Sequence, residues 1–327
     1  MLPSRRISLA GSRQATNLRR SDVPPITETA DYMSLLPEES SASLKRLELL
    51  ARSKKQGSIN GRHPSPHKGF SVEFAEHREY VPGDDLRNLD WRVFAKNDRH
   101  YIKQFVEETN LRCTVVLDAS GSMAYKGRAA QVVAGETLTK FDYGRYLAAA
   151  IAYLAIGQRD SAGLVTFDHG VRDYLRPTSK PSQIRHILQS LHQTAPGGET
   201  GVAGVLHDVA ERIPPRGLVI LISDLFDDPD DISSALHHFA YRQHELVAIH
   251  VMADEELTFP FTRYSDFQDL EPGDARVKVD PSAIRSEYLE RIRGFVAAIE
   301  SACGQLRADY LPANTRKRYT DVLTEYL

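Results

Sequence analysis

Apolar runs and stretches of helical length alternate along residues 111–310. The runs are short and apolar throughout, which is typical of strands buried on both faces of a sheet. They are residues 114–117, 162–167, 218–222 and 246–249. The stretches with apolar residues at helical spacing are residues 140–157, 181–193, 201–213 and 229–241. Because strands alternate with helices, we predict an α/β fold with a doubly wound, mainly parallel sheet.

One further helix is predicted near the end of the chain. Apolar residues recur there at steps of three, four or seven: Ile284, Tyr288, Ile292, Phe295, Ile299, Cys303, Leu306 and Tyr310. This spacing places them on one face of a helix of about seven turns, which we expect to cover the sheet. Residues 311–327 are then left as a C-terminal extension.

The first part of the chain has a different pattern. Residues 1–36 start with an arginine-rich, acid-free stretch and then two prolines, so we predict a flexible tail that joins no core. Such a start is also typical of an organelle transit peptide. We predict a helix over residues 37–55, a strand from the alternation of residues 70–74, and a turn at residues 82–85. Residues 37–110 should therefore form a small β-containing subdomain.

Composition narrows the class of protein. The chain has 327 residues, with 41 basic and 44 acidic side chains, and this balance does not predict nucleic acid as a partner. The two cysteines, Cys113 and Cys303, match neither a disulfide framework nor a zinc site, which favours a reducing compartment. No apolar run is long enough to cross a membrane. We therefore expect a cytoplasmic protein without a membrane span.

Two of the predicted strands end in an aspartate. Asp118 is followed by Ser120 and Ser122 on a tight turn, and Asp224 follows the run that ends at residue 222. Ligands of doubly wound sheets bind at the carboxyl ends of the strands, so we expect these side chains to share one crevice. Oxygen ligands with few carboxylates suit Mg²⁺ or Mn²⁺. Two unpaired aspartates would repel each other there unless a cation neutralises them, which favours a metal.

These elements resemble the von Willebrand factor A domain with its metal-ion-dependent adhesion site. The matching features are Asp-x-Ser-x-Ser, a helix that starts near Phe141, a Gly-x-Thr loop at residues 198–200, and the later Ser-Asp pair. The resemblance implies a metal shell made of Asp118, Ser120, Ser122, Thr200 and Asp224, the last acting through water.

Each of these residues also has a purely structural interpretation. Asp-x-Ser-x-Ser is common in turns and helix caps. Asp224 could cap the helix near Pro229, and Thr200 could cap the helix over residues 201–213 while also binding metal.

An upstream block resembles the bacterial domain-of-unknown-function family fifty-eight, whose members place it before a von Willebrand A-like fold. The matching residues are Glu73-Phe74, the stretch from Arg78 to Arg87, Asp90-Trp91 and Glu107-Glu108. Within this block we expect ion pairs, with Trp91 as an apolar anchor. The resemblance implies partnership with a MoxR-type AAA ATPase. The chain departs from many relatives in having no N-terminal membrane helices, and in having Gly201 where an aspartate is frequent.

Catalysis has little support in the sequence. Ser120 is not in a Gly-x-Ser-x-Gly turn, no histidine lies in either metal loop, and no P-loop is present. We therefore predict a non-enzymatic protein-interaction module, whose metal accepts an acidic side chain of a partner such as the ATPase. The alternative is a magnesium-dependent enzyme acting on a phosphate or carboxylate substrate, for which Glu199 is the one nearby candidate base.

Overall fold

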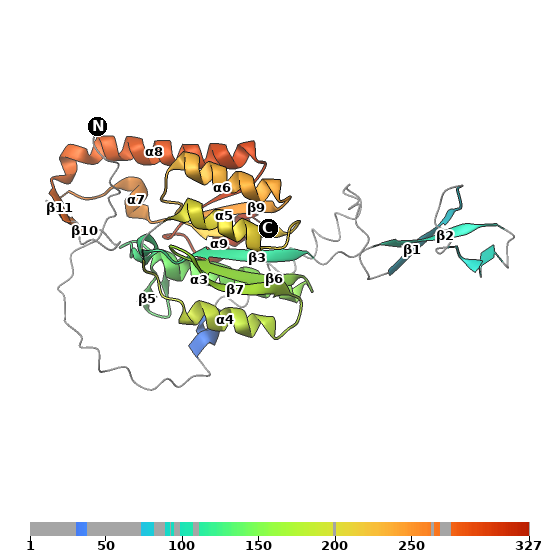
Figure 1. Ribbon diagram of the computed structural model, residues 1–327. Coiled ribbons are helices and arrows are strands. Elements are labelled where there is room, and N and C mark those ends of the chain that lie inside the picture. The colour runs from blue at the N-terminus through green and yellow to red at the C-terminus, as the bar shows by residue number, and fades with distance from the viewer. Residues whose placement is uncertain are drawn as a thin grey trace. The chain divides into compact units, whose positions relative to one another are not determined.

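The computed structural model of the chain describes residues 31–37, 73–81, 89–91, 93–94, 99–106, 111–198, 201–262, 265–268 and 276–326 (Figure 1). The chain divides into two compact units, of which one is residues 57–110 and the other holds the rest. Our predictions for residues 1–30, for a helix after Pro37, for the turn at residues 82–85, and for Glu199 and Thr200 lie outside the described residues.

The larger unit is built on a six-stranded sheet with the order β12-β9-β8-β3-β6-β7. The strands are β3 (Arg112–Asp118), β6 (Ser161–Phe167), β7 (Val171–Thr178), β8 (Leu218–Ser223), β9 (Glu245–Met252) and β12 (Asp309–Asn314). All neighbours are parallel except β7, which runs antiparallel to β6 at one edge. The predicted α/β class with a mainly parallel sheet is confirmed.

Helices cover both faces of this sheet (Figure 1). One face holds η1 (Asp31–Leu35), α3 (Lys140–Gly157), α4 (Gln183–Gln193) and α9 (Tyr319–Tyr326). The other holds α5 (Val202–Arg212), α6 (Pro229–Tyr241) and α8 (Pro281–Gln305). Successive residues of β3 alternate between the two cores: Leu117 packs in the first and Val116 in the second. Burial of both faces is why these strands are apolar throughout.

The remaining elements are short. They are η4 (Gly121–Ala124), β4 (Val132–Val133), β5 (Glu136–Thr137), α7 (Asp254–Thr258), β10 (Ser265–Gln268) and β11 (Arg276–Val279). No helix among the described residues is long and apolar enough to span a membrane.

The long helix ends earlier than we predicted, and Tyr310 does not lie on it. α8 stops at Gln305, Arg307 takes a left-handed conformation with φ of 55°, and Tyr310 belongs to β12. The helical spacing continued because Leu306 and Tyr310 both pack against the same apolar core after the chain has turned. The sheet therefore extends past residue 310, into the segment that we had set apart as a C-terminal extension.

The prediction that residues 1–36 join no core is wrong for the last of them. Leu35 is 3% exposed and lies in the core beneath α3 and α4, with Tyr32 packed against the same cluster. The apolar residues at the end of this otherwise polar segment were the signal that we overlooked.

The smaller unit contains β1 (Glu73–Glu79) paired antiparallel with β2 (Tyr101–Val106), which confirms its β content. Among the residues of this unit whose burial is described, Leu89 and Ile102 are buried and apolar, and an isolated antiparallel bridge pairs them. Trp91 is 63% exposed and its ring meets Phe94 edge-on, so the prediction of Trp91 as an apolar anchor is wrong.

Candidate functional site

The carboxyl ends of β3 and β8 bring the two predicted aspartates to one place. β3 ends at Asp118, and Asp224 follows the last residue of β8, the strand that pairs with β3. Both side chains are fully buried. Ser223, which the sequence analysis did not assign to the site, joins the two strand ends because its hydroxyl donates to Asp118 Oδ2 at 2.5 Å.

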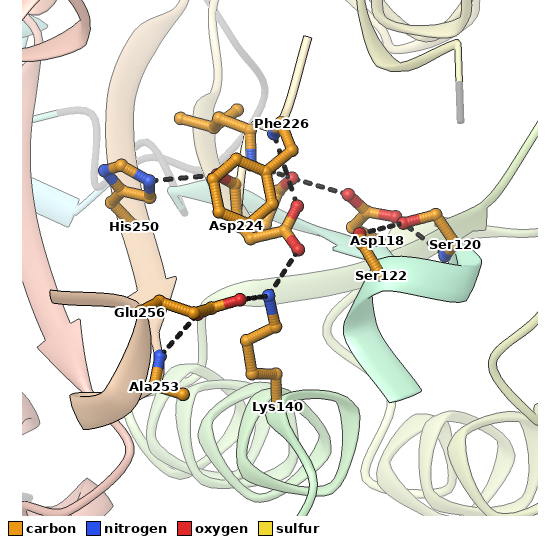
Figure 2. Close-up of polar contacts among 11 residues, drawn as sticks. Asp118, Ser120, Ser122, Lys140, Asp224, Phe226, His250, Ala253 and Glu256 are labelled. Atoms are coloured by element: carbon orange, nitrogen blue, oxygen red, sulfur yellow. Dashed lines mark hydrogen bonds and ion pairs between the residues drawn. The ribbon is translucent and has the colours of Figure 1, made fainter. Parts of the chain in front are cut away.

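The two serines lie beside Asp118, as predicted (Figure 2). The backbone N–H of Ser120 donates to Asp118 Oδ1 at 2.8 Å, and the hydroxyls of Ser120 and Ser122 are 3.1 Å apart. All three side chains are buried. The structure therefore gathers Asp118, Ser120 and Ser122 on one turn, with Asp224 on the neighbouring loop.

Burial makes Asp118 a weaker acid than an ordinary aspartate. The pKa of Asp118 rises to about 7, chiefly because the carboxylate is desolvated and secondly because Asp224 repels it. The hydrogen bonds from Ser223 and Ser120 act in the opposite direction and are outweighed. The carboxylate form of Asp118 would gain from a nearby cation.

A buried lysine that we did not predict lies at the same site. Lys140 Nζ is 2.7 Å from Asp224 Oδ2 and 2.7 Å from Glu256 Oε1, and it lies 4.7 Å from the centre of the Phe226 ring (Figure 2). Burial alone would lower the pKa of Lys140, but the two carboxylates raise it above its ordinary value. Our premise of two unpaired aspartates is therefore wrong, because Asp224 has an internal counter-ion.

A signal for Lys140 was present in the sequence. Thr139 and Asp142 form a capping box at the start of α3, which places Lys140 in the first helical turn. A cation at a helix N-terminus is disfavoured by the helix dipole, so a lysine there requires a compensating anion.

Glu256 connects the site to α7. Its Oε2 accepts the N–H of Ala253 at 2.7 Å, while its Oε1 accepts from Lys140. Burial raises the pKa of Glu256. When all groups are ionised, the three carboxylates of Asp118, Asp224 and Glu256 and the one ammonium of Lys140 leave a formal charge of −2.

The main chain at Asp224 is held by a neutral histidine. His250 Nε2 is 2.9 Å from the carbonyl oxygen of Asp224, and its Nδ1 is 2.8 Å from the Tyr310 hydroxyl. Burial lowers the pKa of His250 to about 4. The cap of α6 is Asp228, whose side chain accepts from Asp230, so Asp224 does not cap that helix.

The oxygen atoms fit a hard divalent cation. Within the described part of the chain, no three histidine, cysteine, aspartate or glutamate side chains are arranged to hold a metal ion. A cation here would therefore use the serine hydroxyls and water beside Asp118, and Mg²⁺ accepts such a set of few carboxylates and several neutral oxygens. The formal charge of −2, reached when all four groups are ionised, is the feature that such an ion would balance.

Among the described residues, no hydrogen bond joins Ser120 or Ser122 to a histidine. His250 is the histidine of this cluster, and its two ring nitrogens are hydrogen-bonded to the Tyr310 hydroxyl and the Asp224 carbonyl. Neither nitrogen is bonded to Ser120 or Ser122. This arrangement does not favour a serine hydrolase.

Comparison with known proteins gives a family match. Residues 76–294 match the family described as "Protein of unknown function DUF58". The chain is 30% identical over 271 residues to "Uncharacterized protein Rv1480" of Mycobacterium tuberculosis and to "Uncharacterized protein Mb1516" of Mycobacterium bovis, covering 80% of this chain and 82% of each relative.

Solved structures show more distant likeness. BatB from Bacteroides thetaiotaomicron is 14% identical with a TM-score of 0.41, over 66% of this chain and 98% of that one. A von Willebrand factor type A protein from Catenulispora acidiphila is 14% identical with a TM-score of 0.31, over 57% of this chain and 42% of that one. The fold described above rests on the strand order of this chain itself.

Proposed function

Since the chain belongs to the DUF58 family, we propose that it is a non-enzymatic protein-interaction module that requires a divalent metal ion. The observation that carries this proposal is the buried cluster of oxygen atoms with a formal charge of −2 at the carboxyl ends of β3 and β8. Mg²⁺, or Mn²⁺, would be held by Asp118, Ser120 and Ser122, with Asp224 acting through water. Thr200 completes the proposed ligand set.

The partner supplies the remaining ligand. A divalent ion held by few protein carboxylates keeps exchangeable positions, and an acidic side chain of another protein can take one of them. The family resemblance supports a MoxR-type AAA ATPase as this partner, with the present chain as its adaptor in protein assembly or maturation. The buried, free thiols of Cys113 and Cys303 are compatible with a cytoplasmic location.

The test is coprecipitation of the purified chain with a purified MoxR-type ATPase in magnesium. A chelator would also strip the ATPase of magnesium, so Asp118→Ala is the sharper comparison, with Asp208→Ala, at an exposed position of α5, as the matched control. We expect the wild type and Asp208→Ala to retain the ATPase and Asp118→Ala to lose it. Equal retention by all three would remove the metal site from the interaction.

A further inference from the structure

The segment between α4 and α5 is joined to the loop that carries the aspartate and the two serines. Residues 195–198, here called the bridging segment, make two backbone hydrogen bonds with that loop. Gly197 donates to the carbonyl of Ala119 at 2.9 Å, and Gly121 donates to the carbonyl of Gly198 at 3.3 Å. The two loop residues concerned lie on either side of the central serine, so the bridging segment determines how that serine is held.

An arginine of the edge strand β7 holds the bridging segment from its other side. Arg172 donates from Nη1 to the carbonyl of Ala195 at 2.5 Å and from Nη2 to the carbonyl of Gly197 at 2.9 Å. Its Nε donates to Asp168 Oδ2 at 2.6 Å. One planar guanidinium therefore binds two carbonyls of the segment and one carboxylate of the β6–β7 turn.

Asp168 fixes the direction of the guanidinium. Its side chain is 3% exposed and also accepts the N–H of Gly170 at 3.2 Å, within its own turn. Burial opposes ionisation of Asp168, yet the hydrogen bond and ion pair with Arg172 hold the pKa of that carboxyl below its ordinary value. The pair is therefore charged at neutral pH, and the arginine is oriented before any ligand arrives.

Asp168 also lies against the last residue of the bridging segment. Gly198 has φ of 93°, and a Cβ built on it would lie 3.0 Å from Asp168 Oδ2. The positive φ favours glycine at this position, and the close approach leaves little room for a Cβ beside Asp168. Glu199 and Thr200 follow Gly198 in the sequence. Arg172 and Asp168 therefore contact the chain immediately before the Gly-x-Thr loop.

We propose that Arg172 is a positioning residue of the metal site, which acts by fixing the bridging segment against the loop that holds Asp118, Ser120 and Ser122. The effect on metal affinity rests on the proposed function, whereas the effect on the order of the loop does not. Replacing the arginine leaves the carbonyls of Ala195 and Gly197 without these donors. Part of the free energy of metal binding is then needed to order the bridging segment and the loop beside it, so the metal binds more weakly.

The first test is calorimetric titration of the full chain with MgCl₂. We expect Arg172→Ala to bind Mg²⁺ roughly 10- to 100-fold more weakly than the wild type, the loss typical of a group that orients metal ligands. Arg172→Lys should stay weak because an ammonium cannot make the planar fork. The control is Arg176→Ala, at an exposed position of the same strand. Full affinity in Arg172→Lys would show that charge alone acts and would overturn the positioning role.

The second test is amide hydrogen exchange, and it does not depend on metal. The amides of Gly121 and Gly197 should exchange faster in Arg172→Ala and in Arg172→Lys than in the wild type. In Arg176→Ala their exchange rates should equal those of the wild type. Arg172→Lys keeps the charge beside Asp168 and serves if the alanine variant does not fold. Unchanged exchange in the Arg172 variants would overturn the inference. A wild type that binds no Mg²⁺ would overturn the proposed function while exchange still decides the role of Arg172.

Discussion

Lys140 Nζ lies 2.7 Å from Asp224 Oδ2, and both side chains are buried. The same ammonium lies 2.7 Å from Glu256 Oε1. One internal cation thus pairs with two carboxylates. Among the described residues, the partners of Asp118 on the adjacent strand end are the neutral donors Ser120 and Ser223. Burial raises the pKa of Asp118 to about 7, and the charge of Asp224 contributes to the same rise. The chain itself therefore compensates part of the charge of this site, and in the function proposed here a further cation compensates the rest.

Replacing Lys140 with methionine should destabilise the protein strongly. The change leaves Asp224 and Glu256 buried without their counter-ion, for which a loss of about 3–5 kcal/mol in the free energy of unfolding is expected. Urea unfolding in chelator measures this loss. Lys126→Met, at an exposed position, is the matched control and should change stability little. A Lys140→Met variant as stable as the wild type would contradict the ion pairs described here.

The contribution of Asp118 to the stability of the metal-free protein should fall as the pH rises from about 4 to about 7. The pKa of Asp118 is raised from 3.8 to about 7 in the folded state. Between these values the folded state binds more protons than the unfolded state, so raising the pH removes stability, and above pH 7 the loss is complete. Burial of His250 lowers its pKa to about 4 and acts in the opposite direction, so thermal unfolding at pH 5 and pH 7.5 in chelator is compared between the wild type and a variant without the Asp118 carboxyl.

Asp118→Asn isolates the contribution of this carboxyl. The variant has no ionisation at the position and should lose less stability than the wild type between pH 5 and pH 7.5. Magnesium should reduce the dependence of stability on pH in the wild type, because the ion favours the carboxylate form of Asp118. Identical slopes for the wild type and Asp118→Asn in chelator would show that Asp118 ionises normally.

Leu35→Ala should cost about 2–5 kcal/mol in the free energy of unfolding, as expected for removing a buried leucine side chain from a packed core. Leu35 is 3% exposed, whereas its neighbour Met33 is 55% exposed and supplies the matched control. Urea midpoints of Leu35→Ala and Met33→Ala should differ clearly. Equal midpoints would mean that η1 does not pack against α3 and α4 in solution.

The central strands and two helices could be predicted from the sequence because their environments leave a strong pattern. β3 and β8 are covered on both faces, so nearly every position is apolar. α3 and α6 span the predicted residues 140–157 and 229–241. β7 was missed because it is an edge strand with exposed and half-buried residues and no apolar run. β12 was missed because its apolar residues continue the spacing of α8.

The sequence predicted the site residues that lie at strand ends, but not their partners from distant parts of the chain. Asp118 and Asp224 directly follow buried strands, and the strand-end rule therefore applies to them. Lys140 is 84 residues from Asp224 and 116 residues from Glu256 along the chain. Only the fold brings these three together, so the ion pairs and the charge of −2 could not be read from local pattern. Arg172 was missed because two of its partners are backbone carbonyls, which have no sequence signature. Asp168 was missed because its partners are that arginine and the backbone N–H of Gly170.

Thermal unfolding with and without magnesium, for the wild type and Asp118→Ala, tests the metal site most directly. Mg²⁺ that binds only the folded state stabilises it by mass action, by about 2.7 kcal/mol at a concentration 100 times its Kd. We predict a clear rise in Tm for the wild type and none for the variant, which in chelator should be no less stable than the wild type because a buried, uncompensated carboxylate has been removed. An equal rise in both proteins, or none in either, would contradict a divalent metal site at Asp118.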